Sequence, residues 1–437
     1  MNPKKYNVFA AKFNSEQFWD SRLSVKLPAV RNKRLENIVH TMDELMFAFC
    51  KGEEDMVLTT LPMNQDHLEY LHSIGFSFQN KSFYKNIEKN ESGEYEYDAA
   101  QASGLSFQKG GILSTYAVIP EYNEFAEKMH LEYMHPDKKA VSDVNSKLYS
   151  TIAAKELGFS KYAVIVRSEE EFLENSKKIL QTTGSVLVKE EYGVSGKGNL
   201  RIQDEKGWNS IAKNISMQCK KGKEVRLILE PAFQVKQDFS VQYRIEQDFG
   251  KAEFLSIQQI WNKDRAYNGS INAEKDLLEF LEKEQYFALM EKLCGRLYQD
   301  GYFGDVCVDS MILDDNTLVP IVEINARKSM SLIKKSLEKK INASETCLFY
   351  VDTIVHPELE FSDVLTRLSA SGFLYTKEKG CGIIVLTAQT LLVNTYLGSG
   401  KTQKGRIYFL GVGEKEELLS WMEQIKGICD AFSEKMQ

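Results

Sequence analysis

The order of apolar and polar positions along the chain predicts a mixture of helices and strands. Short, mainly apolar runs fit strands, as at Asp55–Thr60 and Val186–Glu190. Elsewhere apolar residues recur every three or four positions, which is the spacing of a helix with one buried face. Asn64–Ser73 has this spacing, and Gly75 follows it as a helix stop. The hydrophilic stretch 85–101 fits a surface loop or hairpin.

The periodicity becomes sharper beyond residue 140. A helix is predicted over Val144–Leu157, where Gly158 supplies the C-terminal stop. Ser168, with Glu171 three residues later, is expected to cap a second helix that extends to Leu180. Further strands are predicted at Tyr162–Val166, Leu200–Ile202, Val225–Pro231, Phe239–Ile245, Val306–Leu313, Leu318–Ile324, Gly382–Leu386 and Arg406–Leu410. Further helices are predicted at Phe125–Met134, Lys275–Gln299 and Lys415–Phe432.

The length of 437 residues is enough for two or three domains of about 150 residues each. We expect an N-terminal α/β domain over residues 1–140 and a central domain over 141–345. The central domain is expected to divide into two subdomains near residue 225. The remaining residues, 346–437, are predicted to form a small C-terminal α/β extension.

Composition and charge argue against several classes of protein. The chain has 55 Lys and Arg against 62 Asp and Glu, a net charge of -7, so no basic surplus is available for a nucleic-acid backbone. No apolar run reaches about 18 residues, which disfavours a membrane helix, and the polar first 18 residues do not resemble a signal peptide. Seven scattered cysteines without a CxxC pair favour neither a zinc site nor a disulfide framework, so a cytoplasmic protein is expected.

Candidate chemistry begins at residues 193–198, a loop with three glycines, a serine and a lysine. The backbone N–H groups of such a loop can surround a phosphate. The residues that would do so are Gly193, Ser195, Gly196, Lys197 and Gly198. The loop is no Walker A motif, which needs Gly at 191 and Ser or Thr at 198, and a glycine-rich hairpin without a ligand is the alternative.

Lys189 lies on the strand just before this loop. A strand lysine that points toward a nucleotide can pair with a phosphate oxygen or a purine ring nitrogen, and an exposed strand lysine is the alternative. Residues 398–402 (GSGKT) also end like a P-loop, but residue 395 is Thr and a strand follows at Arg406–Leu410 where a P-loop needs a helix. A hairpin turn is the preferred interpretation of these residues.

Two predicted strands, Val306–Leu313 and Leu318–Ile324, carry acidic side chains among apolar neighbours. Period-two geometry puts Glu323 and Asn325 on one face, and pairing through the turn at 314–316 can bring Asp309 beside them. Carboxylate and amide oxygens are hard ligands that suit Mg²⁺ better than Zn²⁺. A solvated face is the alternative, but it conflicts with the apolar flanks, because unpaired buried charge is costly.

Several further residues could contact a nucleotide or a substrate. Arg327 falls on the same side as Asn325 and could reach a γ-phosphate or a substrate anion. The strand that ends at Glu230 could offer backbone groups to an adenine edge, and Asp238 could accept hydrogen bonds from ribose hydroxyls. A surface glutamate and a turn aspartate are the alternatives.

Taken in order, these segments resemble the ATP-grasp superfamily. The ordered set is Ser146-Lys147, Lys189, the 193–198 loop, Glu230, Asp238, Asp309, Glu323-Ile324-Asn325 and Arg327. The similarity covers 141 to about 343. It implies an ATP-grasp fold of the α/β (α+β) class, with an N-terminal α/β domain before it and a C-terminal extension after it.

The resemblance also implies residue roles. Lys147 and Lys189 would bind the α- and β-phosphates and the adenine side, and the 193–198 loop would cover the β- and γ-phosphates. Asp238 would bind the ribose. The adenine would be read by Glu230, Pro231, Ala232 and Phe233. Two Mg²⁺ ions, with Mn²⁺ as an alternative, would be held by Asp309, Glu323 and Asn325.

One departure from the family pattern concerns the oxyanion. Many such ligases carry an arginine two residues before the metal-binding Asp, and this chain has Cys307 there. Arg244, Arg265 or Arg327 would then supply the charge, or the chemistry differs. Residues 258–272 would form a loop over the site, with Arg265 and Tyr267 as substrate contacts.

The implied activity is ATP-dependent ligation of a small-molecule carboxylate to an amine, through an acyl phosphate, with release of ADP. Residues 113–147 also resemble the peptide ligases of natural-product pathways, so an amino acid or peptide substrate is expected. A carrier-protein thiol is an alternative acceptor. A kinase that phosphorylates a hydroxyl and a nucleotide-binding regulator without turnover are the rival hypotheses. A homodimer is an expectation from the fold alone.

Overall fold

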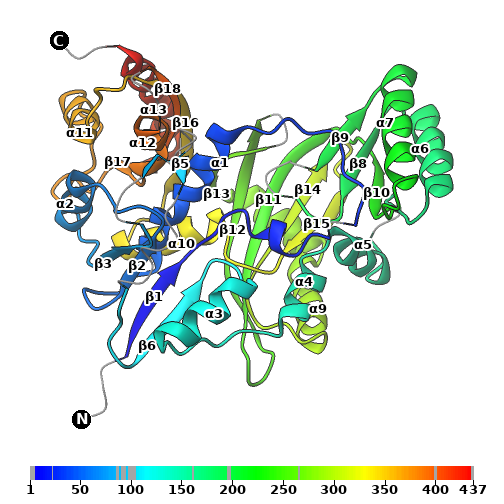
Figure 1. Cartoon of the computed structure of the whole chain (residues 1–437), viewed down its shortest axis with the longest axis horizontal. Helices are drawn as coiled ribbons and strands as arrows, with labels where there is room; N and C mark the ends of the chain where they lie inside the picture. Colours follow the sequence, from blue (N-terminus) through cyan, green and yellow to red (C-terminus); the bar gives the residue numbers. More distant parts are fainter. Residues whose placement is uncertain are drawn as a thin grey trace.

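The computed structural model describes residues 5–21, 23–84, 88–89, 95–96, 105–159, 162–193, 198–263, 266–397 and 401–434. Within these residues the chain forms sheets of four, four and eight strands and one two-stranded ladder (Figure 1). Helices pack on the faces of the sheets. The predicted α/β class is therefore confirmed.

The N-terminal sheet is parallel, with strand order β3-β2-β1-β6. Its strands are β1 (Tyr6–Ala10), β2 (Met56–Thr59), β3 (Gln79–Ser82) and β6 (Gly111–Thr115). Its helical segments are η1 (Ser15–Phe18), α1 (Lys33–His40), η2 (Thr41–Phe49), α2 (Gln65–Ser73) and α3 (Pro120–Met129). Asn64 caps α2 by accepting a hydrogen bond from the His67 N–H, so the predicted strand and helix in this region are confirmed.

The short strands β4 (Glu88–Lys89) and β5 (Tyr95–Glu96) pair antiparallel, which agrees with a hairpin in the hydrophilic stretch.

The second sheet, here called the small sheet, is antiparallel with strand order β7-β10-β8-β9. Its strands are β7 (Val164–Val166), β8 (Val186–Glu190), β9 (Asn199–Ile202) and β10 (Leu227–Pro231). Two helices cover it, α6 (Glu169–Thr183) and α7 (Glu205–Cys219). Ser168 caps α6 as predicted, whereas α7 was not expected from the sequence pattern.

The large sheet has eight strands in the order β15-β14-β11-β12-β13-β16-β18-β17, each pair antiparallel. Its strands are β11 (Val235–Ile245), β12 (Ala252–Lys263), β13 (Ala266–Asn272), β14 (Gly304–Leu313), β15 (Leu318–Asn325), β16 (Thr346–Val355), β17 (Gly382–Val385) and β18 (Gln403–Val412). The predicted turn between β14 and β15 is present, and Asn316 adopts a φ of 63° in it.

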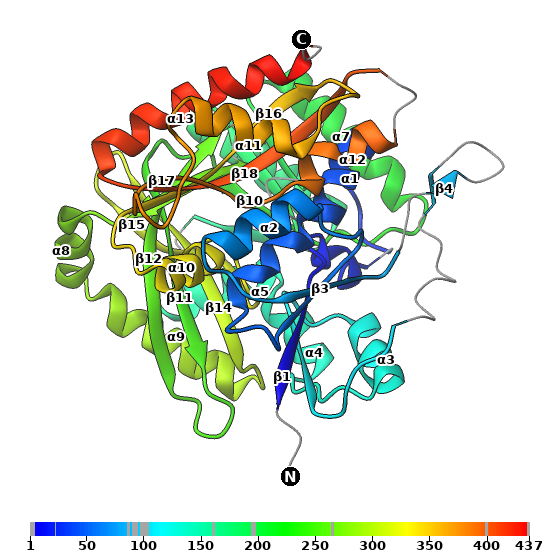
Figure 2. The same cartoon turned by 90° about the vertical axis from the view of Figure 1, so that its left-hand side faces the viewer.

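The last 90 residues continue the large sheet and share a core with the N-terminal layer. Strand β16 pairs with β13, so the extension adds three strands to the central sheet. Phe361 and Phe409 lie in one apolar cluster with Phe47 and Phe76. Helix α11 (Phe361–Ala370) lies beside α2, and the His67 ring contacts the Phe361 ring (Figure 2). The other helices here are α10 (Met330–Ile341), α12 (Gln389–Tyr396), α13 (Lys415–Asp430) and the 3-10 turn η4 (Ala431–Ser433).

Three predicted helices have different bounds in the structure. The helix expected over Val144–Leu157 is α5 (Lys147–Glu156), which starts three residues later because the Ser146 side chain caps it; a separate helix, α4 (Lys138–Val144), precedes it and was not predicted. The helix expected over Lys275–Gln299 is two helices, α8 (Lys275–Lys283) and α9 (Tyr286–Gln299), since Gln285 breaks it with a φ of 54°. The helix expected over Phe125–Met134 is α3, five residues earlier. Pro120 starts it, and His130 ends it in the left-handed conformation.

The expected loop over 258–272 is instead the hairpin of β12 and β13. Alternate side chains here face the sheet interior, and the Gln258 side chain is only 1% exposed. A buried polar residue such as Gln258 makes a strand look like a loop in the sequence, although its backbone is paired with the neighbouring strand. Residues 264–265 lie outside the described residues. Residues 398–400 of the GSGKT segment lie outside the described residues; the strand predicted after it is confirmed as β18.

Candidate active site

The β14–β15 hairpin brings the predicted acidic set together. Asp309 lies directly opposite Glu323 in the ladder, and Cys307 lies opposite Asn325. The Asn325 side-chain amide donates a hydrogen bond of 2.8 Å to an Asp309 carboxylate oxygen. Two carboxylates and one amide oxygen thus share a single face at the edge of the large sheet.

The acidic set is electrostatically unfavourable without a cation. Burial, and then the charge of Glu323, raises the pKa of Asp309 to about 7. No three His, Cys, Asp or Glu side chains gather into a metal-binding group in the described part of the chain, so a metal here would rest on the two carboxylates and the Asn325 oxygen. Those hard oxygen donors fit Mg²⁺.

Lys147 reaches this set from the first turn of α5. The buried Lys147 ammonium donates a hydrogen bond of 2.8 Å to Glu323 and one of 3.1 Å to the Gly193 carbonyl. Its own backbone N–H donates to the Glu191 carbonyl at 3.0 Å. One lysine therefore links the acidic set to the start of the glycine loop.

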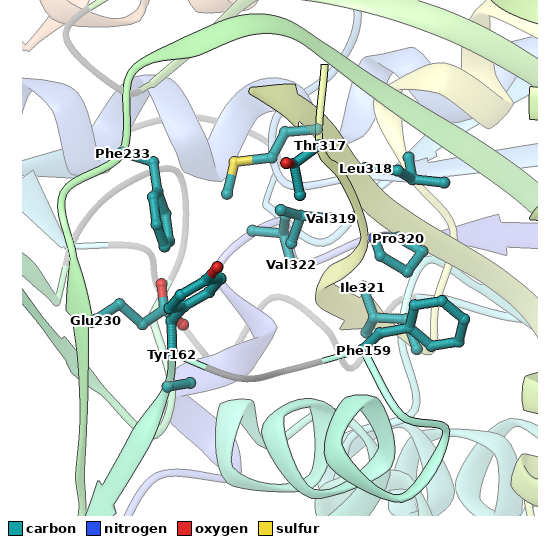
Figure 3. A pocket seen from close by; sticks show the side chains of 12 residues that line it. Phe159, Tyr162, Glu230, Phe233, Thr317, Leu318, Val319, Pro320, Ile321 and Val322 are labelled. Carbon is teal, nitrogen blue, oxygen red and sulfur yellow. The ribbon is translucent and has the colours of Figure 1, made fainter. Parts of the chain in front are cut away.

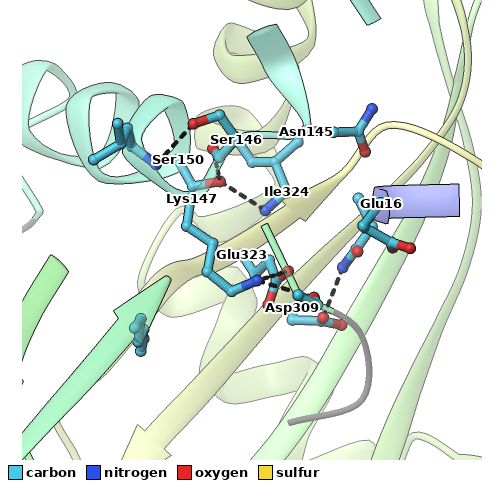
Figure 4. A network of polar contacts seen from close by, with 12 residues as sticks. Glu16, Asn145, Ser146, Lys147, Ser150, Asp309, Glu323 and Ile324 are labelled. Carbon is cyan, nitrogen blue, oxygen red and sulfur yellow. Dashed lines mark hydrogen bonds and ion pairs between the residues drawn. The ribbon is translucent and has the colours of Figure 1, made fainter. Parts of the chain in front are cut away.

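The break between α4 and α5 fixes Lys147 against β15 (Figure 4). The Asn145 side-chain oxygen accepts a hydrogen bond from the Ala326 N–H at 2.9 Å. The Ser150 hydroxyl accepts one from the Ile324 N–H at 3.0 Å. Asn145, between α4 and α5, and Ser150, on α5, thus dock this helix onto the strand that carries Glu323.

Arg327 also belongs to the cluster. Its guanidinium donates to the Asn325 side-chain oxygen at 3.0 Å, and to the buried Glu16 carboxylate at 2.6 and 2.9 Å. The Tyr116 hydroxyl accepts a further hydrogen bond at 2.9 Å. Burial alone would lower the pKa of Arg327, but the charges of Glu16 and Tyr116 outweigh it and raise that pKa. Arg327 is therefore a fixed cation next to the acidic set.

The other two arginines named from the sequence are placed differently. Arg244 forms an ion pair with Asp305, with an N–O distance of 2.7 Å. It lies four residues along β11 from Ser240, the ladder partner of Asp309, so its backbone is roughly 13 Å from that level of the sheet. Arg244 thus does not join the acidic set, and Arg265 lies outside the described residues.

A cavity of about 60 Å³, partly open to solvent, lies between the small sheet and the β14–β15 hairpin (Figure 3). Glu230 lines it, and its carboxylate pairs with the Lys189 ammonium at 2.5 Å. The Tyr162 and Phe233 rings pack edge to face, with centroids 5.3 Å apart and an interplanar angle of 69°. Met311 and Phe159 add apolar walls. A flat, mostly apolar ring with a polar edge would match this lining.

Pro231, Ala232 and Asp238 are the remaining residues that the sequence predicted to contact the nucleotide. Pro231 ends β10 and pairs with Val186, and Ala232 follows it at partial exposure. Asp238 lies on β11 opposite Met311, and its charge contributes to the raised pKa of Asp309. Asp238 thus lies beside the cavity wall, two residue pairs along the β11–β14 ladder from Asp309.

Comparison with known proteins identifies the fold. No protein-family model matches the chain. The butirosin acyl-carrier protein–L-glutamate ligase of Niallia circulans is 22% identical over 317 residues, which cover 70% of this chain and 69% of that protein. The N5-carboxyaminoimidazole synthetase of Staphylococcus aureus, solved with ADP, superposes with a TM-score of 0.52 at 13% identity, covering 98% of this chain and 99% of that one. The chain has the ATP-grasp fold.

A second solved structure agrees. The biotin carboxylase domain of Hydrogenobacter thermophilus 2-oxoglutarate carboxylase, solved with MgADP, ADP and bicarbonate, gives a TM-score of 0.53 at 12% identity and covers 96% of this chain and 89% of that one. The predicted ATP-grasp fold is therefore confirmed. The Niallia relative is named a ligase, which agrees with the predicted class of enzyme.

Only the two ends of the ATP-grasp glycine loop are described. Gly193 accepts the hydrogen bond from Lys147, and Gly198 has a φ of +80° and accepts a hydrogen bond of 2.7 Å from the Glu190 N–H. Ser195, Gly196 and Lys197 lie outside the described residues. Their role remains a prediction.

Sequence reasoning missed Glu16 and most of the cavity wall of this ATP-grasp site. Glu16 lies 311 residues before Arg327 in a short 3-10 segment, and no local pattern marks it. Met311 could have been found, because it lies two residues after Asp309 and so shares its side of the strand. Phe159 and Tyr162 follow the Gly158 stop and carried no signal beyond their aromatic rings.

Proposed function

We propose that the protein is an ATP-dependent ligase that activates a carboxylate as an acyl phosphate and joins it to an amine, releasing ADP and phosphate. One observation supports this most strongly. The paired carboxylates Asp309 and Glu323, the Asn325 oxygen and the Arg327 guanidinium converge at one sheet edge, and the Lys147 ammonium reaches them from another layer. Such a set of charges suits the transfer of a phosphoryl group.

The nucleotide would bind between the small sheet and the β14–β15 hairpin. The adenine would enter the cavity beside Phe233 and Tyr162, where Glu230 and Lys189 provide the polar edge. Lys147 and the ends of the 193–198 loop would contact the phosphates. The S. aureus structure with the same fold was solved with ADP, which supports a nucleotide site in this fold.

Asp309, Glu323 and Asn325 would hold Mg²⁺. The raised pKa of Asp309 reports two like charges in a buried place, and a divalent cation would relieve that repulsion. When bound, Mg²⁺ would neutralise the charge that moves between the β- and γ-phosphates. Two ions are proposed, with Mn²⁺ as an alternative.

Arg327 would supply the positive charge that many related ligases place at position 307. An amine attack on an acyl phosphate passes through a tetrahedral oxyanion, which a fixed cation stabilises. Glu16 and Tyr116 hold the Arg327 guanidinium in one orientation, so no reorganisation is needed at the moment of attack. Arg244 is less suited because it is paired with Asp305 away from the acidic set.

A second candidate function differs in the group that accepts the activated carboxylate. The Niallia relative is named as a ligase of an acyl-carrier protein and L-glutamate. A thiol on a carrier-protein arm could therefore replace the amine, with an amino acid as the activated carboxylate. A role in natural-product biosynthesis and a cytoplasmic location belong to the same proposal. None of the helices in the described ranges has both the length and the apolar character of a membrane span.

Release of ADP, coupled to mass spectrometry, tests the proposal. The protein would be incubated with ATP, Mg²⁺ and pools of amino acids and small carboxylic acids, with and without a pantetheine-loaded carrier protein. We expect ADP in equal amount to a product whose mass is the sum of two substrates less one water. A product heavier by a stable phosphate would favour a kinase instead. Glu323→Ala should abolish ADP formation, and Glu282→Ala, at an exposed site on α8, should not.

A further inference from the structure

Residues 23–27, here called the strap, connect the N-terminal layer to the small sheet. Figure 1 shows the dark-blue N-terminal chain reaching the strands β8 and β10. The Val25 and Leu27 side chains are 1% and 6% exposed. They belong to the apolar core of the small sheet, together with Val188 and Leu227. The strap is therefore packed as part of the small sheet although it belongs to the N-terminal chain.

Backbone hydrogen bonds fix the strap along its length. The Val25 N–H donates to the Glu224 carbonyl at 2.9 Å, and the Glu224 N–H donates to the Leu23 carbonyl at 2.8 Å. The Gln218 side chain binds both backbone groups of Lys26, accepting from its N–H at 2.9 Å and donating to its carbonyl at 2.7 Å. A segment with this many partners is held in one position relative to α7 and β10.

Glu190 joins the strap to the end of the glycine loop. Its carboxylate accepts a hydrogen bond of 2.6 Å from the Leu27 N–H and lies 3.5 Å from the Lys26 ammonium. Its backbone N–H donates to the Gly198 carbonyl at 2.7 Å. A Cβ at Gly198 would lie 3.3 Å from the Glu190 Cβ, so loop end and carboxylate are in direct contact.

Three consecutive residues at the end of β8 make three different connections. Lys189 pairs with Glu230 at the cavity, and Glu190 binds the strap. Glu191 accepts from the Ser146 hydroxyl at 2.9 Å, beside the cap of α5. Because side chains alternate along a strand, Glu190 points away from the other two. The same few residues of β8 thus support the nucleotide cavity, the strap and the helix that carries Lys147.

We infer that Glu190 is a positioning residue, and that it and the strap hold the small sheet in the orientation that binds the nucleotide. This inference rests on the proposed function, since it assumes that ATP or ADP occupies the cavity beside Lys189. Glu190 acts through the Gly198 turn and through Lys189. It makes no contact with the nucleotide itself.

Two variants test the inference, one on β8 and one on α7. Glu190→Ala removes the acceptor of the Leu27 N–H, whereas Gln218→Ala releases Lys26 from α7 and leaves β8 unchanged. Glu190→Gln keeps an acceptor oxygen and serves as the conservative variant. Glu174→Ala, at an exposed site on α6, is the matched control. Binding of MgADP would be measured by calorimetry, and amide exchange of the strap would be measured with and without MgADP.

We expect MgADP to slow amide exchange at Val25 and Leu27 in the wild-type protein. Glu190→Ala and Gln218→Ala should lose this response and bind MgADP roughly tenfold more weakly, as expected when a hydrogen bond that holds the strap is lost. Glu190→Gln should restore most of the affinity. Unchanged affinity in both folded alanine variants, with strap exchange indifferent to MgADP, would overturn the inference. A wild-type protein that binds no MgADP would instead contradict the proposed function.

Discussion

Asp309 on β14 lies directly opposite Glu323 on β15, in a ladder closed by a short turn. This pairing places two carboxylates side by side in a buried part of the sheet, and burial together with the second charge raises the pKa of Asp309 to about 7. Such an arrangement costs stability unless a cation compensates it. Lys147 already compensates Glu323 through a hydrogen bond of 2.8 Å, so the repulsion that a metal ion would relieve is centred on Asp309.

Asp309→Asn should separate the effect of the carboxylate pair on stability from its role in binding Mg²⁺. The change removes one of two like charges and keeps the shape of the side chain, so the protein without metal should be as stable as wild type or up to ~1 kcal/mol more stable. ADP formation should fall by at least about 100-fold, because a ligand for Mg²⁺ is lost. Thermal unfolding with and without Mg²⁺ would test both parts. The stabilisation by Mg²⁺ expected in the wild type should be absent from the variant, and its persistence would contradict the assigned ligand role.

Lys189→Met should weaken nucleotide binding. Lys189 is 7% exposed and pairs with Glu230 at the cavity edge, so its loss removes a cation and leaves that carboxylate unpaired. We expect the Kd for MgADP to rise roughly tenfold. Lys213→Met, at an exposed site on α7, is the matched control. Equal affinities for the two variants in calorimetry would argue against Lys189 as a nucleotide contact.

Arg327→Lys should affect chemistry more than nucleotide binding. A lysine cannot reproduce the planar fork that binds Glu16, Tyr116 and Asn325 at the same time. Product formation should fall by about 100-fold or more, while the Kd for MgADP should stay within about threefold. Arg244→Lys offers a comparison, since Arg244 pairs with Asp305 away from the acidic set and should retain near wild-type turnover. A larger loss of turnover in Arg244→Lys than in Arg327→Lys would point to Arg244 as the catalytic cation.

A buried ion pair links α10 to the C-terminal strands. The Lys334 ammonium and the Thr346 hydroxyl both donate to the Glu338 carboxylate, at 2.5 and 2.6 Å, and Lys334 is 0% exposed. Glu338→Gln should lower the free energy of unfolding by about 3 kcal/mol, because a buried ammonium loses its countercharge. The double variant Lys334→Met/Glu338→Leu should recover part of this loss. Urea unfolding of Lys334→Met, Glu338→Leu and the double variant measures the coupling, and additive effects would show that the pair is not coupled.

The chemistry of the site was more predictable than its surroundings. The Asp309 and Glu323 strands flank an evident turn, so their pairing followed from local pattern alone. The start of α5 was predicted three residues early, because apolar spacing extends back to Val144 and the Ser146 cap sets the actual start. Glu16 and the strap could not be found, because their contacts join residues far apart in sequence. Long-range pairing of this kind depends on how the layers pack, which no window of sequence encodes.

The most direct test of the central claim is oxygen transfer from the carboxylate substrate. Carboxylic acids labelled with ¹⁸O at the carboxylate would be supplied with ATP and Mg²⁺, and the released phosphate would be analysed by mass spectrometry. An acyl phosphate intermediate predicts that each released phosphate carries one labelled oxygen, in step with ADP and product. ADP and product formed with unlabelled phosphate would contradict the account, because the carboxylate would not have been phosphorylated.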